Sequence, residues 1–382
     1  MSVSRSRNSA KAARPSVTGQ LAGLDPMLLL TAVALTAFGI LAVYVAGTEQ
    51  QQYYAMNQSL GVVVGLAGAI PLAIIDYRIW LRYLYYIYGA VVVMLLAVIL
   101  FGTDSGGAQR WIDFGPIQIQ PSEFAKLLVV VTLAGFLVKK PIHETKNFLK
   151  SLGLLAIPAG LVFLQPDLGT ALVFGALFIS MAYIGGARLR QIAALGICGA
   201  ALLALAVKLG VLAQYQVARL TAFLDPTGSG DLGYQVAQSK MAIGSGGFTG
   251  KGLSATTLAN LGFLPEDHTD FIFSNLAERI GFAGSVLLLF LFFVFIWRIL
   301  HVATISRDRF GVLIAVGVAT IFLFHVFVNI GMAMGIMPVT GLPLPFISYG
   351  RSSLVVSILS LGLLQSIAMR SRAESAKHSG PS

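Results

Sequence analysis

The feature that most constrains this chain is a series of ten long apolar runs, most of them separated by short polar stretches. A helix needs about 20 mostly apolar residues to cross a bilayer, and most of the runs approach that length. The series predicts an all-α, polytopic membrane protein with about ten transmembrane helices. The expected spans are 25–46, 58–75, 80–101, 122–138, 151–164, 168–186, 192–213, 271–297, 310–331 and 351–368.

The composition excludes a large soluble enzyme. Only 11% of the residues are charged and 56% are hydrophobic, whereas a soluble domain carries about 25% charged residues. The net charge of +10 would suit nucleic acid, but most of the 26 Lys and Arg residues fall in the tails and in alternate loops. Cytoplasmic loops of membrane proteins carry such an excess. We therefore expect no nucleic-acid partner, and a multi-pass membrane protein with both termini in the cytoplasm.

The chain is predicted to form one membrane domain over 25–370, between a basic tail at 1–24 and a second tail at 371–382. Two loops on the expected outer side are long, namely 102–121 and 214–270, and the second precedes the eighth span. Loops of this length are usually functional or disordered, and the aromatic residues of the second argue against disorder. Most of the 16 acidic residues also fall on or near this side. We therefore expect the chemistry at the extracytoplasmic face.

Charged side chains stand inside the fourth span, in the stretch IQPSEFAKLL. Pro121 suits the first turn of a helix. Glu123 then lies where a negative charge matches the helix dipole, and Lys126 shares its face. One interpretation is a structural ion pair. The other is a functional pair facing a cavity, because charges inside membrane helices are costly and usually functional.

Two further polar residues stand close to the starts of expected helices on the outer side. Arg110, in GGAQRWIDFG, is either a solvated loop residue or a phosphate ligand, since a planar guanidinium suits phosphate geometry. Asp167, in QPDLGTA, is either an N-terminal cap or part of a site, and the two roles are compatible.

The 214–270 loop carries polar residues in a Gly-rich setting. Arg219, Gln235 and Lys240 are candidates for substrate binding. The stretch GSGGFTGKG at 244–252 offers closely spaced backbone N–H groups that can cradle an anion, or it is a flexible turn. It lacks the P-loop spacing, so no nucleotide site is predicted.

The stretch FLPEDHTDFIF crowds titratable groups in front of the eighth span. Glu266, Asp267, His268 and Asp270 lie within five positions. If Thr269 caps the helix, Asp270 lies in its first turn, with Ser274 and Glu278 near the same face. A carboxylate fixed there at the membrane boundary can act as a general base, whereas the simpler interpretation is a cap or an interface charge. Carboxylates also suit Mg²⁺ or Mn²⁺, although no closed ligand set is visible.

The stretch MGIMPVTGLPLPFISYGRSS at 334–353 is rich in Pro and Gly. Broken backbone at membrane depth is tolerated where it lines a cavity or is buried in protein. The simpler interpretation is a re-entrant turn.

Several of these stretches together closely resemble the SEDS family of bacterial cell-wall proteins. The stretches are RWIDFGPIQIQPSEFAK, LQPDLGTA, GYQVAQSKMAIGSGGFTGKG, FLPEDHTDFIF and PVTGLPLPFISYG. Their order and the ten-span layout match the family from about residue 25 to 370. The wording of QPDLGTA and PEDHTDFIF resembles the elongation members more than the division members, and the sporulation members are harder to exclude. In one departure, Arg351 stands where the family often has glycine.

The resemblance implies a peptidoglycan glycosyltransferase of the bacterial inner membrane that polymerises lipid II. The essential aspartate of the family falls on Asp270, and its Glu and Lys of the fourth span fall on Glu123 and Lys126. Lys126, Arg219 and Arg110 are then expected to bind the departing pyrophosphate, with a divalent cation as helper or substitute. The candidate catalytic residues are Asp270, Glu123 and Lys126, and the candidate substrate-binding residues are Arg110, Asp167, Arg219, Gln235, Lys240, Glu266, His268, Ser348 and Tyr349.

The resemblance also implies partners, namely a class B penicillin-binding protein and the elongation machinery. Two other classes of function fit a polytopic chain. One is a flippase that moves lipid II, although transporters bind substrate near the midplane, and the ionisable groups here favour the outer edge. The other is a scaffold that only recruits a transpeptidase.

Overall fold

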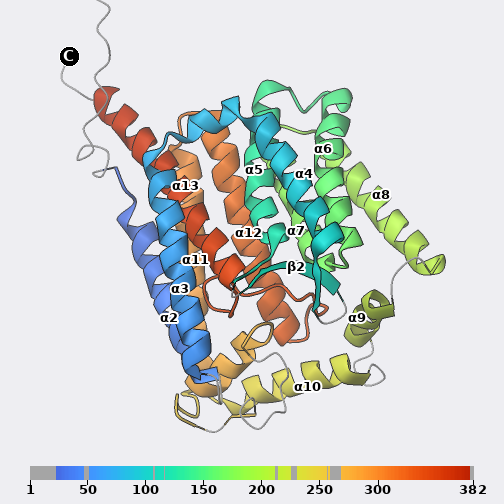
Figure 1. Ribbon diagram of the computed structural model, residues 1–382, viewed down its shortest axis with the longest axis vertical. Helices are drawn as coiled ribbons and strands as arrows, with labels where there is room; N and C mark the ends of the chain where they lie inside the picture. The colour runs from blue at the N-terminus through green and yellow to red at the C-terminus, as the bar shows by residue number, and fades with distance from the viewer. Residues whose placement is uncertain are drawn as a thin grey trace, which may run out of the picture.

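The computed structural model describes residues 23–46, 51–105, 108–115, 117–210, 214–224, 230–255, 257–258 and 268–378. Its long helices form one bundle (Figure 1). Within the described ranges, nine helices are long and apolar enough to cross a membrane, and α7 is a shorter apolar helix. The predicted all-α polytopic fold is therefore confirmed. The ten helices are α2 (Pro26–Ala46), α3 (Gln51–Ile74), α4 (Leu84–Phe101), α5 (Pro121–Lys139), α6 (Thr145–Leu164), α7 (Leu168–Ile184), α8 (Leu189–Lys208), α11 (Ile272–Ile305), α12 (Arg309–Ala333) and α13 (Arg351–His378).

The helices α5, α12 and α13 form the interior of the bundle, because most of their residues are buried. The burial reaches 78%, 67% and 83% over their most apolar windows, against 0% for α8. Helix α8 therefore lies at the edge of the bundle, where its apolar side chains would contact acyl chains in a bilayer. Helices α5 and α12 lie in the interior, so their polar residues are enclosed by protein.

The link between α4 and α5 forms a small sheet that the sequence did not predict. Its strands β1 (Thr103–Ser105), β2 (Ala108–Phe114) and β3 (Ile117–Ile119) are antiparallel in the order β1-β2-β3. Gly115 has a φ of +70° in the turn between β2 and β3, which glycine adopts without steric cost. The sheet lies at the end of the bundle that also carries α9 and α10 (Figure 1), which we call the α10 end.

The long loop before α11 contains two helices, α9 (Gln214–Leu224) and α10 (Gly230–Ser245). Helix α10 runs across this end of the bundle, roughly perpendicular to the long helices (Figure 1). It buries Gly233, Val236, Ser239 and Ala242, which recur at every third position and so form one face. The Ser239 hydroxyl contacts the Ser274 hydroxyl at 2.6 Å and donates to the Ala333 carbonyl. Helix α10 is thus docked on both α11 and α12.

Helix α11 is longer than predicted and kinked at Gly281. This glycine has φ +68° and ψ −168°, a conformation almost restricted to glycine. The Gly-rich stretch packs against the kink, where the N–H groups of Lys251 and Gly252 donate to the Glu278 and Arg279 carbonyls at 3.0 and 2.9 Å. These two N–H groups are therefore engaged with α11, which disfavours the anion cradle.

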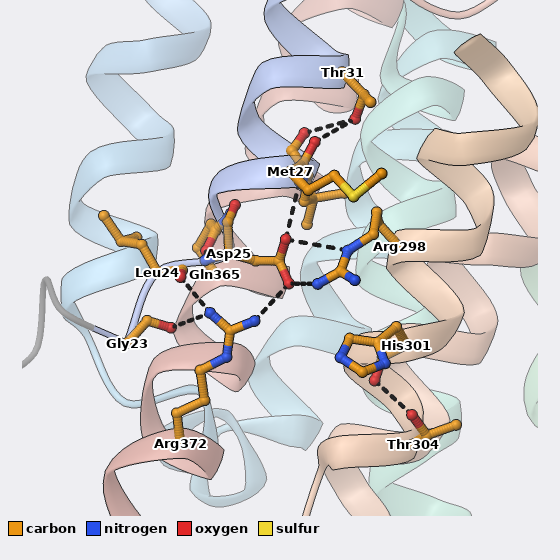
Figure 2. A network of polar contacts seen from close by, with 11 residues as sticks. Gly23, Leu24, Asp25, Met27, Thr31, Arg298, His301, Thr304, Gln365 and Arg372 are labelled. Carbon is orange, nitrogen blue, oxygen red and sulfur yellow. Dashed lines mark hydrogen bonds and ion pairs between the residues drawn. The ribbon is translucent and has the colours of Figure 1, made fainter.

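The opposite end of the bundle is fastened by an ionic network around Asp25, just before α2 (Figure 2). Its fully buried carboxylate binds Arg298 of α11 and Arg372 of α13. The Asp25 N–H donates to Gln365 at 2.8 Å. Three helices that are distant in sequence are thus joined at this end by one carboxylate.

Candidate active site

The candidate site is organised by the non-helical segment 334–350, which connects α12 to α13 at the α10 end. From Val339 to Ser348 most of its residues are buried. Asn329 of α12 donates to the Leu342 carbonyl at 2.8 Å, and the hydroxyl of Ser348 accepts from the Leu344 N–H at 2.8 Å. The segment is thus irregular backbone buried in protein, as its Pro and Gly content indicates.

Asp270 and Arg219 meet at Gly341 of this segment. A Cβ atom placed on Gly341 would lie 3.5 Å from Asp270 Oδ2 and 3.8 Å from an Arg219 guanidinium nitrogen. Gly341 has a φ of +76°, a backbone conformation that favours glycine. Arg219 also donates to the Thr340 carbonyl at 2.8 Å. The predicted base and a predicted pyrophosphate ligand therefore lie at one place, although they come from different elements.

Asp270 lies in a turn before α11 rather than in the helix, so the expected cap at Thr269 is wrong. The helix begins at Ile272, and its N-cap residue is Phe271. The Thr269 carbonyl instead accepts from the Ser348 hydroxyl at 2.7 Å, and the Asp270 carbonyl accepts from Asn329 at 3.0 Å. Contacts with Asn329 of α12 and Ser348 of the 334–350 segment, which sequence spacing cannot reveal, determine the position of this turn.

The sequence also predicted that Asp270, Ser274 and Glu278 lie near one face of the helix. In the structure, Ser274 and Glu278 do not line the candidate site. Ser274 contacts α10, as described above. Glu278 is fully buried and pairs with Lys251 at 2.6 Å, and it accepts the N–H of Leu258 at 3.1 Å. Glu278 therefore holds the loop before α11.

His268 and Tyr349 lie together beside Asp270 in an aromatic cluster. The Tyr349 N–H donates to the His268 carbonyl at 2.9 Å. Both rings contact Tyr54 of α3, with centroid distances of 4.8 Å. Burial raises the pKa of the Tyr349 phenol, so this hydroxyl stays protonated at neutral pH. Three predicted site residues, His268, Ser348 and Tyr349, are thus joined to the turn that carries Asp270.

Glu123 and Lys126 form an ion pair of 2.7 Å that is almost completely buried, with side-chain exposures of 4% and 1%. Glu123 lies in the first turn of α5, as predicted. Lys126 Nζ also contacts His325 Nε2 of α12 at 2.9 Å, and His325 Nδ1 lies 3.0 Å from the Pro343 carbonyl. The pair therefore reaches the same segment as Asp270, but from inside the bundle.

Asp167 and Arg110 lie at the start of α7, next to the same segment. Asp167 caps the helix by accepting the Thr170 N–H at 3.1 Å, which confirms the capping interpretation. Arg110 of β2 donates to the Pro166 carbonyl, so it is engaged with protein rather than solvated. A Cβ atom on Gly169 would lie 2.8 Å from the Thr340 carbonyl, which places the start of α7 against the segment.

The remaining predicted residues are on α10 or outside the described residues. Lys240 is exposed, and a Cβ atom on Gly335 would lie 2.9 Å from its ammonium nitrogen. Gln235 is half-buried on the same helix. Glu266, together with its neighbour Asp267, lies outside the described residues.

A metal site is not supported by the residues that the structure describes. Among them, no group of three His, Cys, Asp or Glu side chains is arranged to hold an ion.

These features occur in a known family. The family model described as "Cell cycle protein", which covers FtsW, RodA and SpoVE proteins, matches residues 25–373. The chain belongs to this family. The resemblance inferred from the motifs is therefore confirmed over nearly the whole chain.

Individual family members are similar to this chain over most of their length. A probable peptidoglycan glycosyltransferase FtsW from Trichlorobacter lovleyi is 37% identical, covering 91% of this chain and 94% of the relative. The peptidoglycan glycosyltransferase MrdB of Escherichia coli K12 is 38% identical, covering 90% and 93%. A chain in a solved peptidoglycan synthase complex, studied for coordination of polymerisation and crosslinking, is 32% identical, with a TM-score of 0.79 and coverage of 91% and 98%.

Two residues that hold the candidate site together were not predicted from the sequence. His325 and Asn329 stand four positions apart in the apolar run FLFHVFVNIG, so they share one face of α12. Both are buried, with exposures of 2% and 0%. Polar side chains inside a membrane helix usually mark a site or face another helix, and this signal could have identified them.

Proposed function

We propose that the chain is a peptidoglycan glycosyltransferase that polymerises lipid II at the outer face of the membrane during cell elongation. The observation that carries the proposal is the meeting of Asp270 and Arg219 at Gly341. A carboxylate beside a guanidinium supplies the two groups that glycosyl transfer from a pyrophosphate donor needs, namely a base and a positive charge.

In this reaction the 4-hydroxyl of a GlcNAc unit attacks the anomeric carbon of a MurNAc pyrophosphate. Asp270 accepts the hydroxyl proton as the new oxygen–carbon bond forms. The bond between the anomeric carbon and the pyrophosphate oxygen breaks, and undecaprenyl pyrophosphate leaves with the electron pair. A single displacement converts the α linkage of the donor into the β linkage of the glycan, so the transfer is inverting.

Arg219 is the group best situated to stabilise the leaving pyrophosphate, since it lies beside Asp270 and belongs to the loop that precedes α11. Lys126 is almost completely buried, so it would act directly on the pyrophosphate only if the segment over it moves. Arg110 donates to a backbone carbonyl at the start of α7 and would act there mainly by shaping the site.

The α10 end would face the outside of the cell. The opposite end carries several arginines, including Arg78, Arg298 and Arg372, and positive charge favours the cytoplasmic side. This orientation puts both chain ends in the cytoplasm and Asp270 where lipid-linked disaccharide is polymerised.

The elongation role rests on the wording of two motifs, QPDLGTA and PEDHTDFIF. Division and elongation relatives are almost equally similar to the chain, at 37% and 38% identity. A class B penicillin-binding protein is the proposed partner, since a similar chain was solved within a peptidoglycan synthase complex. Rescue of rod shape in a bacterium depleted of its elongation polymerase tests the role, and rescue of division instead would refute it.

A flippase is the second candidate, because a polytopic chain with buried charges suits transport. The concentration of candidate residues at the α10 end favours the enzyme. Two assays on the purified chain separate the functions, namely polymer formed from lipid II in detergent and lipid II movement in sealed vesicles. We expect the chain to form polymer without moving lipid II across the vesicle membrane. Movement of lipid II without polymer would instead identify a flippase. An EDTA arm of the polymer assay tests the need for a divalent cation.

A further inference from the structure

His325 is the one described side chain that joins the buried Glu123–Lys126 pair to the segment at which Asp270 lies. It is 2% exposed in the middle of α12. Its Nε2 atom is 2.9 Å from Lys126 Nζ, and its Nδ1 atom is 3.0 Å from the Pro343 carbonyl oxygen. The imidazole therefore bridges α5 and the 334–350 segment.

The two contacts determine the tautomer of the ring. A carbonyl oxygen only accepts hydrogen bonds, so Nδ1 must carry a proton. A lysine ammonium only donates, so Nε2 must present its lone pair. Lys126 is ion-paired with Glu123 at 2.7 Å, and a charged imidazole next to its ammonium group would place two cations side by side in the protein interior. His325 is thus a neutral ring with one donor and one acceptor in use.

The bridge leaves part of Lys126 available. In the described part of the chain, Glu123 and His325 engage two of the three N–H donors of its ammonium group. The remaining donor can bind a substrate oxygen when substrate displaces the part of the segment that covers Lys126. His325 is the partner of Lys126 that lies outside α5. Its position therefore sets the direction in which the remaining N–H donor points.

Helix α12 fixes Asp270 by a parallel contact one turn later. Asn329 donates to the Leu342 carbonyl at 2.8 Å and to the Asp270 carbonyl at 3.0 Å. His325 and Asn329 therefore bind two consecutive carbonyls of the segment, those of Pro343 and Leu342. One face of α12 holds both candidate catalytic regions in register.

We propose that His325 is a positioning residue for glycosyl transfer, which aligns the Lys126 ammonium with the Asp270 site through the Pro343 carbonyl. The inference rests on the proposed function, since it assigns Lys126 a role in the transition state. An imidazole suits this position because it is rigid and offers a donor and an acceptor on opposite sides, which no shorter polar side chain does.

Two substitutions separate the contacts of the ring. His325→Gln places an amide oxygen near the Nε2 position, where it can accept from Lys126. His325→Asn places an amide nitrogen near the Nδ1 position, where it can donate to Pro343 but leaves Lys126 without its second acceptor. Thr320→Val is a matched control, because Thr320 of α12 donates at 2.8 Å to Ser180 of α7, away from the site.

The experiment measures polymerisation of lipid II by each purified variant at saturating substrate, with thermal unfolding measured alongside. We expect His325→Asn to lower kcat about ten- to hundred-fold, the cost of one hydrogen bond to a charged group. His325→Gln should stay within a few-fold of the unsubstituted chain, at a melting temperature similar to that of His325→Asn. Thr320→Val should leave kcat unchanged.

Equal kcat for the Asn and Gln variants would overturn the inference. So would a loss of kcat that follows the loss of melting temperature across all three variants, because this indicates packing alone. Failure of the unsubstituted chain to form polymer would instead refute the proposed function, so the two failures are distinguishable.

Discussion

A double-mutant cycle on Glu123 and Lys126 tests whether their ion pair is part of a buried polar network. The side chains are only 4% and 1% exposed and lie 2.7 Å apart. Removing one partner of a buried pair leaves an uncompensated charge, which costs about 3–5 kcal/mol. We therefore expect Lys126→Met and Glu123→Leu each to lower the free energy of unfolding by about that amount. The double variant buries neither charge, so it should lose about 2–3 kcal/mol less than the sum of the single losses.

The assay is reversible unfolding in mixed detergent micelles, followed by circular dichroism. A matched control is the pair of Arg78 with Glu374, which has a similar separation of 2.6 Å but exposures of 37% and 34%. An exposed pair contributes about 0–1 kcal/mol, so Glu374→Gln should have a small effect. Two results would show that burial does not strengthen the Glu123–Lys126 pair. One is a loss of unfolding free energy in each single variant as small as that of Glu374→Gln, and the other is a coupling energy near zero in the cycle.

Two further predictions concern the bundle away from the site. Gly281→Ala should lower the melting temperature of the purified chain strongly, because the φ of +68° is unfavourable for alanine and its Cβ would overlap the Gly250 backbone; an unchanged melting temperature would show that the kink can relax. Burial raises the pKa of Asp25, but hydrogen bonds from Arg298 and the Leu28 N–H and the charges of Arg298 and Arg372 outweigh it, so its pKa lies below the usual value. The ionised form is therefore favoured in the folded state, and this stabilisation should persist at neutral pH and decline as the pH falls below about 4. Unfolding measured against pH should show that decline weakened in Asp25→Asn, and an unaltered profile would contradict the assignment.

The sequence predicted the membrane architecture because each span is set by its own apolar run. Each of the ten apolar runs corresponds to one helix of the bundle, whatever their order in space. The Pro121–Glu123 helix start and the Asp167 cap were predictable for the same reason, since both depend on neighbours within four residues.

The arrangement of the site could not be predicted, because it depends on contacts between distant parts of the chain. Thr269 is a residue type that often caps helices, yet its carbonyl accepts a hydrogen bond from Ser348. The helix starts only at Ile272. The link at 102–121 forms strands of three, seven and three residues that pair with one another, and strands this short leave little periodicity in the sequence. Likewise, Arg219 and Asp270 lie at one place only because both approach Gly341.

The proposed mechanism depends most directly on the Asp270 carboxylate as the base of glycan polymerisation. The decisive measurement is polymer formation from lipid II by purified Asp270→Asn, compared with the unsubstituted chain at equal melting temperature. Asparagine keeps the size of the side chain but cannot accept the hydroxyl proton as a carboxylate does. We predict glycan strands from the unsubstituted chain and none from the variant. Strands of normal length and yield from Asp270→Asn would contradict the mechanism.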